Sequence, residues 1–160
     1  MAPIKISFEQ FLEALDANSL DFALSLNDYM INNGCKGTFE EKKSGLLGSY
    51  KHTKTKKSVI NVLFRKQGLI VRIYGENIGS YSDFLNTLPE KMVQEIERAG
   101  ACGHLTNNGC STKCKGYDFT IRNQHFQKCR YSCFEFLVND ESKEYVKAFV
   151  ENETQARLAV

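Results

Sequence analysis

The second half of the chain carries a cluster of cysteines, and this cluster constrains the fold more than any other feature of the sequence. Five of the six cysteines and two of the three histidines lie between residues 102 and 133. The cysteines are Cys102, Cys110, Cys114, Cys129 and Cys133, and the histidines are His104 and His125. Thiols gathered in this way pair as disulfides in an oxidising compartment or bind a metal ion in a reducing one.

Length and composition favour the reducing compartment. A chain of 160 residues that is 42% hydrophobic can bury a core large enough to fold without disulfides. Its first ten residues contain no apolar run like that of a secretory signal, and no stretch approaches the roughly 18 apolar residues of a membrane span. We therefore expect a soluble, cytoplasmic protein that does not enter the membrane, and we interpret the cysteines as a structural zinc site.

The spacing of the cysteines selects a candidate set of zinc ligands. Structural zinc takes four thiolate or imidazole ligands in a tetrahedron. Cys110 and Cys114 form a local pair, and Cys129 is a third candidate. The fourth ligand is Cys102, Cys133 or one of the histidines, and we favour Cys102 because it follows a predicted helix exit where the chain turns. Cys133 is expected to pack in an apolar strand as a small hydrophobic residue.

Other interpretations of the cluster stay open. The spacing is looser than that of a two-pair zinc ribbon, which leaves buried free thiols and a redox or disulfide pair as alternatives. A four-thiolate zinc site is net negative, and nearby basic residues would offset its charge. These residues are Lys113, Lys115, Lys128 and Arg130. A catalytic zinc needs an open coordination position, and the chain has no HExxH pair, although Cys102-Gly103-His104 can contribute to a mixed site.

Hydrophobic periodicity predicts an α+β fold in which helices flank an antiparallel β-meander. Helices are expected at residues 8–15, 18–32, 81–88, 89–100 and 140–152, and strands at 38–43, 46–52, 58–66, 69–74, 117–121 and 134–138. The last two strands are expected to pair and to form, with the last helix, a zinc-stabilised C-terminal hairpin-helix unit. No linker divides the chain, so we expect residues 1–160 to form a single domain, with a zinc-organised segment at about 101–138 and a frayed tail after Asn152.

Positive charge is concentrated in the predicted meander. Residues 36–72 contain ten basic and two acidic side chains, a local balance of +8, whereas the whole chain has a formal net charge of only +2. The loop at 51–57 is therefore either a solvated loop that favours solubility or a site for the phosphates of a nucleic acid. The candidate phosphate contacts are Lys51, Lys54, Lys56, Lys57, Arg65 and Arg72.

One cysteine lies outside the cluster. Cys35 follows the second predicted helix, where a single cysteine usually packs in the core. It can act as a nucleophile only if a histidine base lies nearby in space.

The cysteine segment resembles that of a group of small bacterial proteins without an assigned function. The resemblance rests on Cys110-x3-Cys114-x-Gly116-Tyr117-x-Phe119, followed by Lys128-Cys129-Arg130-Tyr131 and a phenylalanine-rich strand. The hairpin from Phe64 to Gly75 is similar to theirs as well, and the likeness covers about residues 45–154. It implies that the cysteines matching Cys102, Cys110, Cys114 and Cys129 recur in the group, while the position of Cys133 varies. It implies no activity.

These features together predict a binding or regulatory module inside the cell rather than an enzyme, with a structural zinc ion. A nucleic-acid-binding protein that uses the basic loop is the first alternative, and a zinc- or cysteine-dependent enzyme is the second. The sequence does not indicate the partner, which can be a nucleic acid or a small ligand, or the oligomeric state.

Overall fold

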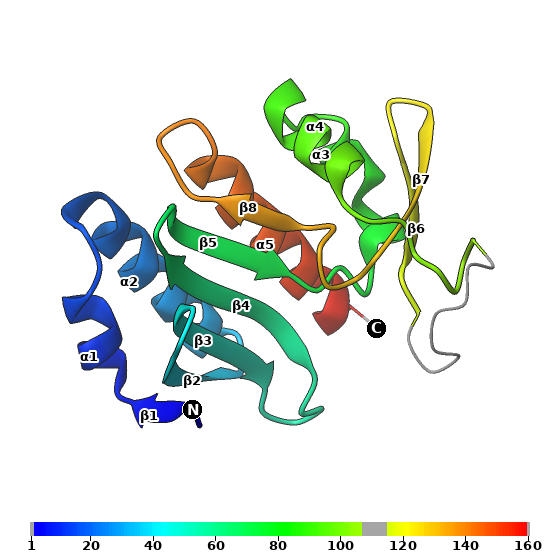
Figure 1. Cartoon of the computed structure of the whole chain (residues 1–160). Helices are drawn as coiled ribbons and strands as arrows, with labels where there is room; N and C mark the ends of the chain where they lie inside the picture. Colours follow the sequence, from blue (N-terminus) through cyan, green and yellow to red (C-terminus); the bar gives the residue numbers. More distant parts are fainter. Residues whose placement is uncertain (1, 107–114, 160) are drawn as a thin grey trace.

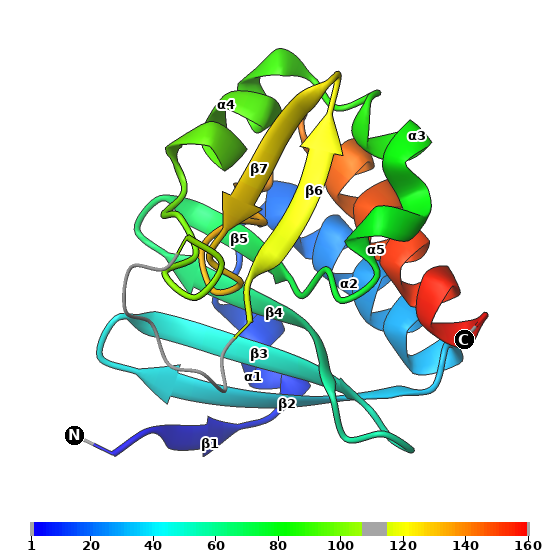
Figure 2. The ribbon, with the colours of Figure 1, turned by 90° about the vertical axis from the view of Figure 1, so that its right-hand side faces the viewer.

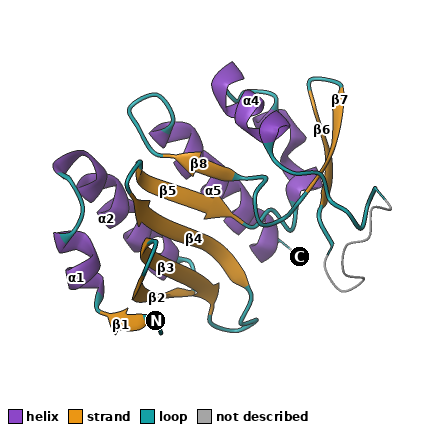
Figure 3. Ribbon diagram, viewed as in Figure 1, coloured by secondary structure: helices purple, strands orange, loops and turns teal. Residues whose placement is uncertain are grey.

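The computed structural model describes residues 2–106 and 115–159, and it has an α+β fold with two antiparallel sheets (Figures 1 and 3). The strands are β1 (Ile4–Ile6), β2 (Cys35–Lys42), β3 (Gly45–His52), β4 (Ser58–Arg65), β5 (Gly68–Ile73), β6 (Tyr117–Ile121), β7 (Gln124–Lys128) and β8 (Glu135–Leu137). The helices are α1 (Phe8–Glu13), α2 (Ala17–Asn32), the 3-10 helix η1 (Ile78–Tyr81), α3 (Ser82–Leu85), α4 (Glu90–Arg98) and α5 (Lys143–Leu158).

The main sheet has six strands in the order β1-β2-β3-β4-β5-β8, and all its pairs are antiparallel. The predicted meander is confirmed, since β2 to β5 follow one another in both sequence and space. Strand β1 was not predicted, because its three residues are too few to show an alternating pattern in the sequence.

The predicted pairing of residues 117–121 with 134–138 is wrong. Strand β6 pairs with β7, where Phe119 faces Phe126, and β8 instead extends the main sheet beside β5. Phe126 is the one fully buried residue of β7, so this strand lacks an apolar pattern in the sequence. The turn between β6 and β7 places Arg122 and Asn123 at φ angles of 48° and 69°, the left-handed conformation that a tight two-residue hairpin requires.

The predicted starts of α1 and α4 are confirmed, while the predicted end of the last helix is wrong. The Ser7 side chain accepts from the Gln10 backbone at 3.1 Å, and the Gln10 side chain accepts from the Ser7 backbone at 2.8 Å, which completes the predicted capping box of α1. Helix α4 begins directly after Pro89, as expected. Helix α5 continues to Leu158 instead of fraying after Asn152, because Glu153 and Thr154 are buried and Arg157 donates to the carbonyls of Ser58 and Tyr74.

Helices α1, α2 and α5 lie on one face of the main sheet; in Figure 1, α2 and α5 pass behind the strands and α1 lies to their left. The ring of Phe11 in α1 lies 5.1 Å from that of Phe39 in β2, and the ring of Phe149 in α5 lies 6.0 Å from that of Phe136 in β8. Strand alternation sends the intervening residues to the other face. There a polar row crosses the sheet at Ser49, Asn61, Arg72 and Glu135.

A cluster of aromatic rings joins the small β6-β7 sheet to the rest of the molecule. Phe134 lies 5.2 Å from both Tyr117 and Phe119 of β6 and 5.0 Å from Phe149 of α5, measured between ring centroids. Phe134 itself is fully buried. The hairpin that carries the cysteine segment is therefore part of the main hydrophobic core.

Candidate functional site

Two of the four predicted zinc ligands lie on hydrogen-bonded neighbouring segments. Ala101 forms an antiparallel bridge with Lys128. Beside it, the Cys102 amide donates to the Gln127 carbonyl at 3.0 Å, and the Cys129 amide donates to the Gly100 carbonyl at 2.8 Å. The exit of α4 and the end of β7 thus hold Cys102 and Cys129 close together in the fold.

The sulfur of Cys102 lies in an environment that favours the thiolate. Burial alone raises the pKa of this thiol, but hydrogen bonds from the backbone amides of Leu105, Gly116 and His104 outweigh burial, and the net pKa lies below the usual value. Only glycine fits at position 116 without a steric clash, because a Cβ atom there would lie 2.6 Å from the Cys102 sulfur and 2.4 Å from the Lys128 carbonyl oxygen. The chain therefore passes directly against Cys102 at Gly116.

The other two predicted ligands, Cys110 and Cys114, lie outside the described residues, so the four-cysteine set stays a prediction. Within residues 2–106 and 115–159, no group of three or more histidine, cysteine, aspartate or glutamate side chains is arranged to hold a metal ion. The described part of the chain contributes the pair Cys102 and Cys129.

The alternative ligands differ in their surroundings. Cys133 is buried, as predicted, and burial raises its pKa, but it lies in the turn that precedes β8 rather than in a strand. Its amide donates to the Cys129 carbonyl at 3.0 Å. His125 is exposed on β7, and its Nε2 atom lies 2.6 Å from Asp118 Oδ1. His104 is half-buried in the turn after Cys102.

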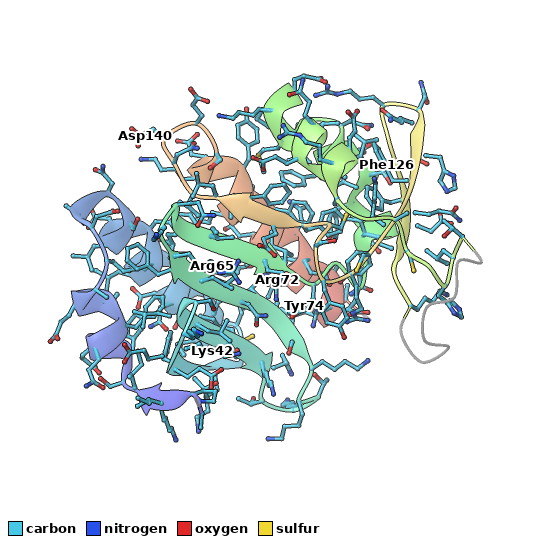
Figure 4. All side chains as sticks on the ribbon, viewed as in Figure 1. Lys42, Arg65, Arg72, Tyr74, Phe126 and Asp140 are labelled. Carbon is cyan, nitrogen blue, oxygen red and sulfur yellow. The ribbon has the colours of Figure 1, made fainter. Side chains whose placement is uncertain are left out.

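The structure separates the basic residues of the predicted nucleic-acid site into two groups. On the sheet, Arg72 and Arg65 form ion pairs with Glu135, at 3.0 Å and 3.8 Å, and Figure 4 labels both arginines. The four lysines, by contrast, form no ion pair with any residue that the structure describes. Lys51 and Lys56 lie in and after β3, whereas Lys54 and Lys57 line a cavity between the β3-β4 loop and the end of α5.

A histidine does lie beside Cys35. Cys35 and His52 are direct partners across strands β2 and β3, and both line the same cavity. Burial raises the pKa of the Cys35 thiol, and the nearby charge of Arg157 opposes this only partly. The thiol form therefore dominates at neutral pH, which favours a packing role for Cys35 over a nucleophilic one.

The polar cluster at the end of α5 is the site component that the sequence did not indicate. The Glu153 carboxylate is fully buried and accepts hydrogen bonds from the backbone and side chain of Asn77, from Tyr81 and from Arg157. Glu153 and Arg157 are four residues apart on one helix face, a spacing that signals an ion pair. Because the chain after Asn152 was expected to be frayed, this spacing was not interpreted as an ion pair on a helix.

Comparison of the chain with protein-family models, with curated proteins and with solved structures found no match. None of the helices in the described residues is both long enough and apolar enough to cross a bilayer.

Proposed function

We propose that this protein is a non-catalytic binding module whose segment at about 101–138 is organised by one structural zinc ion. The proposed ligands are Cys102, Cys110, Cys114 and Cys129. The observation that carries the proposal is the pairing of the segments that bear Cys102 and Cys129, and the lowered pKa of the Cys102 thiol, which backbone amides favour, supports it. Amides that donate to sulfur stabilise the thiolate, which is the form that binds zinc.

The connectivity of the chain is compatible with the remaining ligands. Cys114 precedes Gly116 by two residues, and Gly116 lies against Cys102. Because two residues span at most about 7 Å, the chain length permits Cys114 to approach the same point. Cys110 is four residues further back. Four thiolates would close the coordination shell, so the ion would supply a crosslink rather than a reactive position.

Lys128 already ties the two cysteine-bearing segments together. Its Nζ atom donates to the carbonyls of Glu97 and Ala99 at 2.8 Å and 2.9 Å, at the end of α4. A cation at a helix C-terminus is favourable, and here it comes from the residue next to Cys129. This contact holds the helix exit and the hairpin in the arrangement that a shared zinc ion would need.

Elemental analysis of protein purified without added metal tests the zinc proposal. We expect one zinc ion per chain, and we expect the metal to be lost in Cys102→Ser and in Cys114→Ser. Cys35→Ser is the matched control and should keep the zinc, because Cys35 lies in the main sheet. A wild-type protein that is fully folded and free of metal would contradict the proposal.

Nucleic-acid binding by the basic loop is a second candidate function. The observation that favours it is that Lys51, Lys54, Lys56 and Lys57 have no ionic partner among the described residues. Arg65 and Arg72 are less suited to it, because both already pair with Glu135. Binding of DNA or RNA that weakens steeply with salt, and that is lost when Lys54, Lys56 and Lys57 become glutamate, would support this candidate.

A further inference from the structure

A cavity lies at one end of the main sheet. It has a volume of about 660 Å³ and is bounded by the start of β2, the β3-β4 loop and the last turn of α5. Figure 2 shows that loop and the end of α5 on the same side of the molecule. Cavities of this size hold small organic ligands such as metabolites.

The cavity carries an excess of positive charge. Lys54 and Lys57 line it without an ionic partner among the described residues. The remaining charges of its wall are compensated, because Arg157 pairs with Glu153 and Glu76 pairs with Arg130. An anion that enters the cavity therefore meets two uncompensated ammonium groups.

The β3-β4 loop adds neutral donors to these two cations. The Thr55 amide donates to Nδ1 of His52 at 3.4 Å, which leaves the Nε2 hydrogen as the donor of a neutral His52 ring. The Thr55 hydroxyl oxygen accepts from the Lys57 amide at 3.3 Å, so its hydrogen is available to a ligand. Two lysines, a hydroxyl and an imidazole from the end of β3 and the β3-β4 loop thus line the cavity.

Part of the cavity lining is apolar. Val59 is almost completely buried, Leu158 is half exposed at the end of α5, and Cys35 contributes a buried thiol. Such a wall suits the organic part of a ligand rather than a second charged group.

We propose that this cavity binds a small organic phosphate, with the phosphate at the β3-β4 loop and the organic part against Val59 and Leu158. A phosphate presents three acceptor oxygens and up to two negative charges, which match two lysines and donors from several directions. A carboxylate is best matched by a bidentate arginine, and the Arg157 guanidinium already donates to Glu153, Ser58 and Tyr74.

The same geometry argues against a nucleic-acid strand as the occupant of this cavity. A strand is neutralised by cations spaced along an open surface. Lys54 and Lys57 instead line a concave site, whereas Lys51 and Lys56 are not among its lining residues.

Calorimetric titration of the full chain at low salt tests the proposal, with inorganic phosphate, AMP and phenyl phosphate as probes. Adenosine, phenol, benzoate and a short single-stranded DNA are the comparison ligands. We expect the organic phosphates to bind more tightly than inorganic phosphate and much more tightly than their uncharged parents. In Lys54→Gln/Lys57→Gln, the affinity for the organic phosphates should fall by roughly tenfold or more. Each exposed charge contributes modestly to binding, and the double variant removes two of them.

The matched control is Lys51→Gln/Lys56→Gln, which removes the same charge from the end of β3 and the β3-β4 loop outside the cavity and should leave the affinity within about twofold. No binding of any phosphate probe at about 10 mM would overturn the proposal. So would tighter binding of benzoate, or of the DNA with equal loss in both double variants. The inference specifies the ligand of the module proposed above, and it can fail while the zinc analysis succeeds, because it uses none of the cysteine ligands.

Discussion

The buried carboxylate of Glu153 gives the sharpest test of the fold around the cavity. Two donors reach each of its oxygens: Asn77 N at 3.1 Å and Tyr81 Oη at 2.6 Å on Oε1, and Asn77 Nδ2 at 3.1 Å and Arg157 Nε at 2.8 Å on Oε2. All four contacts need an acceptor. Glu153→Gln keeps the shape of the side chain but places an NH₂ group against two of these donors.

The expected cost follows from those two contacts. Hydrogen bonds to charged groups contribute about 1.5–3 kcal/mol each, and breaking a buried ion pair from one side costs about 3–5 kcal/mol. Arg157, whose side chain is only 14% exposed, would also lose its ionic partner. We therefore expect Glu153→Gln to lower the free energy of unfolding by about 3 kcal/mol or more, a large fraction of the total for a small domain.

Urea denaturation followed by circular dichroism measures this change. Glu151→Gln, on the same helix and half-buried outside the cluster, should change the free energy of unfolding by less than about 0.5 kcal/mol. Tyr81→Phe removes one of the four contacts and should fall between the two. If Glu153→Gln differs from Glu151→Gln by less than about 1 kcal/mol, the cluster does not depend on a carboxylate and this reasoning is refuted.

A pair of glycine variants and the alkylation rate of Cys35 give two further tests of the fold. Gly45→Ala should lower the free energy of unfolding by about 2 kcal/mol or more, because Gly45 has a φ of +135° and a Cβ there would lie 2.2 Å from the Phe64 carbonyl oxygen. Gly79→Ala meets no atom within 4 Å and should be neutral or slightly stabilising in the same denaturation experiment. Cys35 should be alkylated by iodoacetamide far more slowly in the native protein at pH 8 than in urea, as read by peptide mass spectrometry. Its thiol is buried and its pKa is raised, so equal rates would contradict its placement.

Features that depend on near neighbours in the chain were predictable. The capping box at Ser7, the start of α4 after Pro89 and the apolar runs of β4 and β5 each depend on a few consecutive residues. Strand β7 was missed, and β8 was predicted as a strand but with the wrong partner, because pairing depends on surfaces that are distant in the sequence. The main sheet accepts β8 since Phe136 faces Val71 at its edge, a match that no local pattern reveals.

In the candidate sites too, what depends on nearby residues could be predicted from the sequence, and what depends on distant contacts could not. Cysteine spacing marked Cys102 and Cys129 as neighbours, and the bridge at Ala101 and Lys128 brings their segments together. The pairing of Cys35 with His52, and the cavity that both line, depends on the register between β2 and β3 and on the length of α5. Nor does sequence indicate that Glu135 pairs with Arg65 and Arg72 while leaving the loop lysines unpaired.

Arg130 links the proposed zinc segment to the wall of the cavity. It follows Cys129, its guanidinium lies within 6 Å of the ring centroids of Tyr74, Tyr117 and Tyr131, and it forms an ion pair with Glu76 on the cavity wall. The loop proposed to bind phosphate, by contrast, belongs to the β3-β4 hairpin and does not depend on this link. If the proposed zinc ion and phosphate site are both present, removal of zinc with a chelator should loosen the wall at Glu76 while the lysines stay in place. Calorimetric titration should then show an affinity for an organic phosphate that is weakened without being abolished.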